Sequence, residues 1–183
     1  DTAQRLLVDR CLTEAVPPLK KLALKGESYL GRMHALWTLE GLGALDWSTA
    51  SEALKHEHGH VRATALRVMD KIMTDQLRPK TVAEIAVLTG DRGESNSEVL
   101  QQALITLSAA AAEPDDFRLL LQLVAKRPDD LGRTAALTGI AGRHAERQLL
   151  HLGDQNMVRP FTGAAHVDRL LSAILRPVSP RQH

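Results

Sequence analysis

The residues best suited to chemistry in this chain are three histidines and a glutamate within five positions, His56-Glu57-His58-Gly59-His60. Imidazole and carboxylate groups so close together can bind zinc, nickel or copper. The segment directly precedes Val61-Arg62, where the repeat described below places a connection between helices. We therefore predict a polar, solvated turn here, and His56, His58 and His60 remain candidates only for a weak or adventitious metal site.

Three arginines recur at one position of the same repeat: Arg32, Arg62 and Arg133. They could form a basic ladder for an anionic partner. Alternatively, each guanidinium could pair with a carboxylate such as Asp46 or Asp130, or cap carbonyls of a neighbouring helix. Recurrence at equivalent positions favours the structural role.

Aromatic and sulfur side chains give weaker signals. Trp37 lies on an apolar helix face and is predicted to belong to the core, whereas Trp47 fits a packed corner or an exposed binding anchor equally well. Cys11 is the only cysteine, so no internal disulfide is possible, and we expect a small buried residue on a helix. Gly41 and Gly43 are expected at a helix end.

These residues must be positioned by helices. The 183 residues include 30 Leu and 24 Ala but only 16 Val plus Ile, and aromatic residues make up 3%. Strands favour β-branched and aromatic residues, so this composition excludes a β-sandwich or barrel. Apolar residues recur at helical spacing, as in Val61, Ala65, Val68 and Met69. Glycine and proline breakers then predict helices over 2–12, 15–25, 28–43, 48–57, 60–76, 79–89, 96–112, 115–126, 130–143, 145–152 and 162–176, with Ser48 and Asp115 as N-caps.

A short motif repeats along the chain. Arg32-Met33-His34-Ala35-Leu36 aligns with Arg62 to Leu66, with Leu100 to Leu104 and with Arg133 to Leu137. The leucines that end these motifs are 30, 38 and 33 residues apart, which is the length of one helix pair. A single pair cannot bury both of its apolar faces, so neighbouring pairs must stack. The alanine would allow close helix approach, and the leucine would fill the core.

The segments Gly31–Asp46 and His60–Arg67 resemble HEAT repeats. Together with Asp1–Arg10 and Gly132–Arg143, they resemble the HEAT region of large haem-binding, dehydrogenase-like proteins of the Planctomycetes–Verrucomicrobia group, over residues 1–152. The resemblance implies a preceding β-propeller, a following c-type cytochrome domain and an extracytoplasmic, periplasmic parent. The chain departs from that parent because it has no Cys-x-x-Cys-His, so it cannot attach haem and we expect no cofactor in it.

The predicted fold is an all-α, right-handed superhelix of about five HEAT-like helix pairs in one domain. We expect repeat units at about 1–27, 28–58, 59–93, 94–128 and 129–153, followed by a capping helix at 161–177. Since the chain opens on Asp1-Thr2, we also expect it to be a piece of a longer protein.

The predicted function is a non-catalytic scaffold that binds a protein or the flanking domains of its parent. The second helices of the pairs are expected to line a concave binding surface, which carries Lys21, Lys25, Glu52, Lys55, Glu84, Arg118 and Gln122. The alternative is a HEAT-type enzyme or binder that acts on nucleic acid or uses a metal at the His56–His60 cluster. A net charge of +1 and few aromatics argue against nucleic acid, and only His56-Glu57 provides the His-Glu pair that metal-dependent HEAT enzymes use repeatedly. No apolar run is long enough to span a membrane.

Overall fold

The computed structural model describes residues 2–90 and 92–126, and all secondary structure in these residues is helical. The all-α prediction is therefore confirmed for this part of the chain. The predicted fifth pair at 129–153, the capping helix at 161–177 and Arg133 lie outside the described residues. The helices are α1 (Thr2–Asp9), a short 3-10 helix (Thr13–Ala15), α2 (Val16–Lys25), α3 (Tyr29–Gly41), α4 (Trp47–Ala53), α5 (Gly59–Lys71), α6 (Arg78–Thr89), α7 (Ser97–Ala110) and α8 (Pro114–Lys126).

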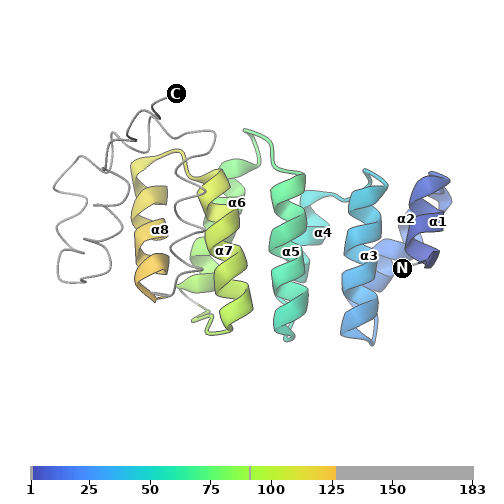
Figure 1. Ribbon diagram of the computed structural model, residues 1–183, viewed down its shortest axis with the longest axis horizontal. Coiled ribbons are helices and arrows are strands. Elements are labelled where there is room, and N and C mark those ends of the chain that lie inside the picture. Colours follow the sequence, from blue (N-terminus) through green and yellow to red (C-terminus); the bar gives the residue numbers. More distant parts are fainter. Residues whose placement is uncertain (1, 91, 127–183) are drawn as a thin grey trace, which may run out of the picture.

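The helices lie in two rows. In the first row α1 packs on α3, α3 on α5 and α5 on α7, and in the second row α2 contacts α4 and α6 contacts α8. The rows are joined by contacts such as those of α2 with α3 and α6 with α7. Figure 1 shows α3, α5 and α7 side by side, with α4 and α6 behind them. Each first-row helix thus presents one face to the second row and another outward.

The core between the rows uses the residues that the repeated motif singles out. The alanines Ala35, Ala65 and Ala103 are at most 1% exposed, and the leucines that follow them are completely buried. A methyl group at the alanine position allows adjacent first-row helices to approach closely, whereas the leucine fills the space beneath them. The sequence motif and the buried contact therefore coincide in α3, α5 and α7.

The helix starts differ from the predicted caps at two positions. Asp46, not Ser48, caps α4: its Oδ1 accepts hydrogen bonds from the Thr49 backbone N–H at 2.8 Å and from the Ser48 hydroxyl at 2.6 Å. The carboxylate of Asp46 is a stronger acceptor than the hydroxyl of Ser48, and Asp46 has the extended backbone that a cap requires. Asp115 lies inside α8, which begins at Pro114.

Cys11 differs from its prediction as a buried helical residue. It is exposed, follows the end of α1 and adopts a left-handed backbone with φ of 49°. The Cys11 N–H bonds to the carbonyl of Val8 and the Leu12 N–H to that of Leu7, both at 3.0 Å, which closes α1 as a Schellman motif. Gly43, 32 residues later, ends α3 in the same way with φ of 64°. The sequence did not predict this turn because the residue at the left-handed position after α1 is a cysteine, whereas the equivalent residue after α3 is a glycine.

Candidate functional site

The three histidines lie at the junction between α4 and α5, as the turn prediction requires. Only His60 is inside a helix, because α4 ends at Ala53 and α5 begins at Gly59. His56 Nδ1 accepts a hydrogen bond from the His58 backbone N–H at 3.0 Å. Partial burial lowers the pKa of His56, and the charges of Arg32 and Arg62 lower it further against the opposing effect of Glu57. The neutral form of this imidazole is thus favoured inside the turn.

The five residues also have the spacing His-Glu-x-x-His, which binds zinc when both histidines lie one turn apart on the same helix. Sequence inspection did not recognise this spacing. The backbone, however, is not helical over positions 56–58, so the two rings do not share a helix face. Among the described residues, no group of three His, Cys, Asp or Glu side chains has an arrangement that could hold a metal ion.

The other two imidazoles contact neighbouring helices. The His58 ring stacks on Tyr29 of α3 with centroids 3.9 Å apart and planes 6° apart. His60 Nδ1 lies 2.5 Å from Glu98 Oε2 of α7, with both side chains about half exposed. The histidines therefore join the first-row helices α3, α5 and α7 at one end.

The two recurring arginines that the structure describes, Arg32 and Arg62, have the structural role that their spacing predicts. Arg32 donates from Nε to the carbonyl of Gly26 at 2.6 Å and from Nη1 to that of Leu24 at 2.8 Å. Arg62 donates in the same way from Nη1 to the carbonyls of His56 and Glu57, at 2.8 and 2.7 Å. Each guanidinium thus caps the end of the preceding second-row helix or the turn that follows it, where carbonyls lack helical partners.

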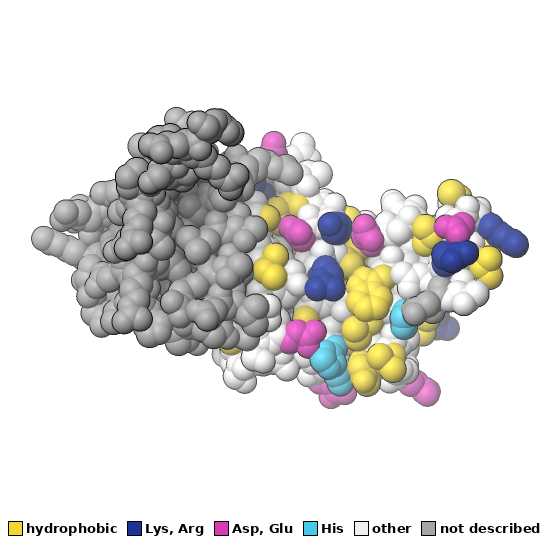
Figure 2. All heavy atoms as spheres, viewed as in Figure 1, with side chains coloured by type: hydrophobic (Ala, Val, Ile, Leu, Met, Phe, Trp, Pro, Cys, Tyr) yellow, Lys and Arg dark blue, Asp and Glu magenta, His cyan; other side chains and the backbone are white. Residues whose placement is uncertain are grey.

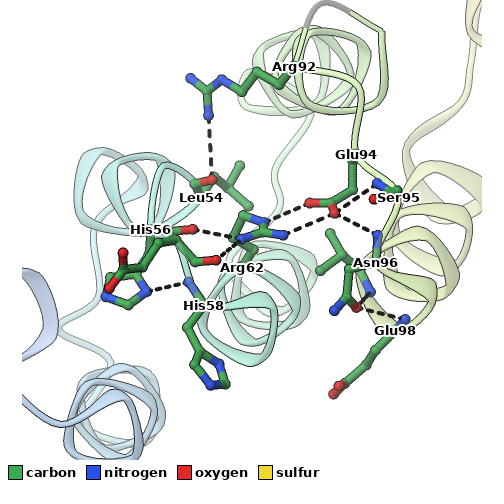
Figure 3. Close-up of polar contacts among 11 residues, drawn as sticks. Leu54, His56, His58, Arg62, Arg92, Glu94, Ser95, Asn96 and Glu98 are labelled. Atoms are coloured by element: carbon green, nitrogen blue, oxygen red, sulfur yellow. Dashed lines mark hydrogen bonds and ion pairs between the residues drawn. The ribbon is translucent and has the colours of Figure 1, made fainter.

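Arg62 makes one further contact that Arg32 lacks. Its Nε and Nη2 bind the two carboxylate oxygens of Glu94 at 2.6 and 3.0 Å (Figure 3). The two side chains are only 16% and 5% exposed. Burial alone would raise the pKa of Glu94, but hydrogen bonds from Arg62 and from the backbone N–H of Asn96 and Ser95 hold it below its ordinary value. The ion pair ties α5 to the connection between α6 and α7.

Of the two carboxylates suggested as arginine partners, Asp46 has another partner, and Asp130 lies outside the described residues. Asp46 pairs with Lys20 of α2, whose Nζ lies 2.5 Å from Oδ2, and not with an arginine. Burial would raise the pKa of Asp46, but the hydrogen bonds from Lys20, Ser48 and Thr49 hold it well below its usual range. Asp46 links α4 to α2 within the second row.

The two tryptophans occupy different surroundings. Trp47 packs against the core at the start of α4, its Nε1 is buried without an acceptor among the described residues, and Lys80 Nζ lies 5.7 Å from its ring. It is a packed corner. Trp37 also packs against the core, but it is only half-buried, and the His34 ring meets its edge at 86° with centroids 5.5 Å apart. Trp37 is both a core residue and part of the outward face of the first row.

The seven proposed partner-binding residues lie on second-row helices or just after them. Lys21, Lys25, Arg118 and Gln122 are exposed. Lys55 Nζ pairs with Glu52 at 2.5 Å, and the half-buried Glu84 accepts a hydrogen bond from Ser51 at 2.6 Å. Arg118 pairs with Asp115 at 3.2 Å. The structure places these residues on the predicted row without showing a ligand-binding arrangement among them.

A hollow that sequence analysis missed lies on the first row. This central hollow, of about 360 Å³, is formed by α3, α5 and α7 around Met33, Trp37, Arg67, Glu98, Gln101 and Ile105. Figure 2 shows this face, where hydrophobic side chains are bordered by acidic, basic and histidine side chains. Met33 and Trp37 are four residues apart, so they share a helix face, and Ala63 with Arg67 repeats the spacing on α5. This shared spacing in neighbouring repeats is the sequence pattern from which the hollow could have been predicted.

A second hollow lies beside the first. The lateral hollow, of about 500 Å³, lies between α1 and α3 and is lined by Arg5, Val8, Asp9, Trp37 and Glu40, among others. Trp37 lines both hollows and therefore stands between them. The two hollows, together called the groove, thus lie on either side of one aromatic side chain along α1, α3, α5 and α7.

Comparison with protein-family models, curated proteins and solved structures found no match to this chain. In the part of the chain that the structure describes, no helix is both long and apolar enough to cross a membrane. A functional assignment must consequently start from the groove and its charges.

Proposed function

We propose that the chain is a non-catalytic scaffold, a HEAT-like solenoid of stacked helix pairs that binds another protein or a flanking domain of its parent. The observation that carries this proposal is the groove across the first row, which combines apolar side chains with charged ones around a half-buried tryptophan. Such a mixture is typical of protein interfaces, where aromatic anchors sit within a polar rim. From the resemblance to HEAT regions we further propose a haem-binding, dehydrogenase-like parent outside the cytoplasm.

The helix contacts support rigid presentation as the mechanism. Each first-row helix packs on the next, and side chains such as Arg62 bridge successive pairs through hydrogen bonds and ion pairs. In a stack of this kind each unit packs only on its neighbours, and this packing keeps the central and lateral hollows at a fixed spacing. A partner can therefore be held along several helices at once without any bond chemistry.

The test is a binding measurement between separately produced proteins. The domains encoded on either side of this chain in its gene are expressed alone, and each is titrated calorimetrically with the chain. We expect a complex with at least one of them, weakened by Trp37→Ala and unaffected by Val87→Ala on α6. Absence of such domains, or absence of binding by every one of them, would contradict the inter-domain form of the proposal.

A further inference from the structure

Some charged side chains along the groove form ion pairs with described residues and others do not. Glu98 is engaged by His60 at 2.5 Å, and Arg5 pairs with Asp9 at 3.5 Å. By contrast, Arg67 beside the central hollow and Glu40 beside the lateral hollow form no ion pair with another described residue. Arg67 is exposed and Glu40 is half-buried. The groove therefore offers one positive and one negative charge, on opposite sides of Trp37.

The spacing of the two hollows follows from helix packing. The central hollow is centred over α5 and the lateral hollow lies between α1 and α3, so their centres are separated by roughly one and a half interhelical distances, about 12–15 Å. An extended β segment advances about 3.3 Å per residue and points alternate side chains the same way, so residues four apart lie about 13 Å apart on one side. Two apolar side chains at positions i and i+4 would thus reach both hollows at once.

We propose that the groove binds an extended polypeptide segment with two apolar residues four positions apart, an acidic residue at the end over Arg67 and a basic residue at the end over Glu40. This inference deepens the proposed scaffold function and rests on it. Apolar contact with Met33, Trp37 and Ile105 supplies the affinity. These two charges, which no described residue pairs, select the partner, because a like charge over either residue would be repelled and would lose its hydration.

The probes are three fluorescein-labelled peptides of eight residues, each with two leucines four positions apart. One carries an acidic residue at one end and a basic residue at the other, the second is acidic at both ends and the third is basic at both. Fluorescence anisotropy with the full chain should rank the mixed peptide first, by about threefold for each matched charge. Arg67→Glu should reverse the ranking in favour of the peptide with two basic ends.

Apolar variants test the anchor contacts. Trp37→Ala should weaken the mixed peptide about tenfold or more, as expected for a central aromatic anchor. Because Trp37 also packs on the core, Ile105→Glu provides a second variant: this side chain is 39% exposed, and its replacement leaves the core intact. Circular dichroism before titration verifies that each variant is folded.

Matched controls lie on the second row. Lys21→Glu changes the net charge as Arg67→Glu does, but it is on α2, and we expect it to leave peptide binding unchanged. The inference is overturned if none of the three peptides binds, if Ile105→Glu binds the mixed peptide normally, or if Lys21→Glu weakens binding as much as Arg67→Glu. Binding of a flanking domain without peptide binding would overturn this inference alone, whereas failure of both would overturn the proposed function as well.

Discussion

Replacing Arg62 by methionine is the change whose cost the structure specifies best. The guanidinium makes four contacts: two with the Glu94 carboxylate and one with each carbonyl of His56 and Glu57. Methionine keeps much of the apolar stem and removes every donor. The variant would leave the carboxylate of Glu94, a side chain that is 5% exposed, with only backbone donors. We therefore expect a loss larger than that of a surface arginine.

The size of this loss can be bounded by comparison with Arg32. Arg32 caps two carbonyls and has no carboxylate partner among the described residues, so Arg32→Met should reduce the free energy of unfolding by about 1–2 kcal/mol. Breaking a buried ion pair by removing one partner costs about 3–5 kcal/mol. Since Arg62 retains some solvent contact, we expect the low end of that range for the ion pair, about 3 kcal/mol, in addition to the capping loss that both variants share. The two equivalent variants should thus differ by about 3 kcal/mol.

Urea denaturation followed by circular dichroism measures both variants on one scale. A double-mutant cycle with Glu94→Gln then separates the ion pair from the capping contacts, with an expected coupling energy of about 2 kcal/mol. Equal losses for Arg62→Met and Arg32→Met, or a coupling energy near zero, would refute the reasoning, because Glu94 would then add nothing to the capping role that both arginines share.

Three further predictions concern helix ends. Cys11→Gly should raise the free energy of unfolding by about 1 kcal/mol because glycine adopts the left-handed backbone without strain, and Gly43→Ala should lower it by a similar amount; thermal denaturation checks both. Asn96→Ala should cost about 1 kcal/mol, since its Oδ1 accepts from two N–H groups at the start of α7; an unchanged urea midpoint would contradict the capping role. The pKa of Asp46 is lower in the folded state than its ordinary value of 3.8, so its stabilisation is present above that pH and is lost as pH falls below it. Asp46→Asn should therefore flatten the acid end of the stability–pH curve, and an unchanged slope between about pH 5 and 2 would count against it.

Much of the described fold follows from sequence periodicity, and the physical reason is local. Helical spacing of apolar residues depends only on neighbours within two turns, so the positions of α2, α3, α6 and α7 were predictable to within a few residues. The buried alanine and leucine of the three described motifs, in α3, α5 and α7, were predictable because stacking requires a small and a large apolar residue at fixed positions. Left-handed turns were harder to predict. Cys11 adopts a left-handed backbone, and a cysteine in the sequence does not indicate that conformation as a glycine would.

The candidate site was harder to predict because it depends on contacts between repeats. Arg67 belongs to α5 and Glu40 to α3, and nothing in either helix alone indicates that both border a groove centred on Trp37. Sequence reasoning placed the binding surface on the second row and named Lys21 and Lys25 there. Trp37 was assigned to the core, where it does pack, but its exposed side was not predicted because that side depends on how α1 and α5 pack beside α3.

Hydrogen exchange of the full chain, with and without the mixed-charge peptide, is the most direct test that the first row is the binding face. Amide protection in α1, α3, α5 and α7 should increase on binding, with the largest change around Trp37, while α2 and α4 remain unchanged. Increased protection confined to α2, α4 and α6 would place the binding surface on the second row and would contradict the assignment of the groove.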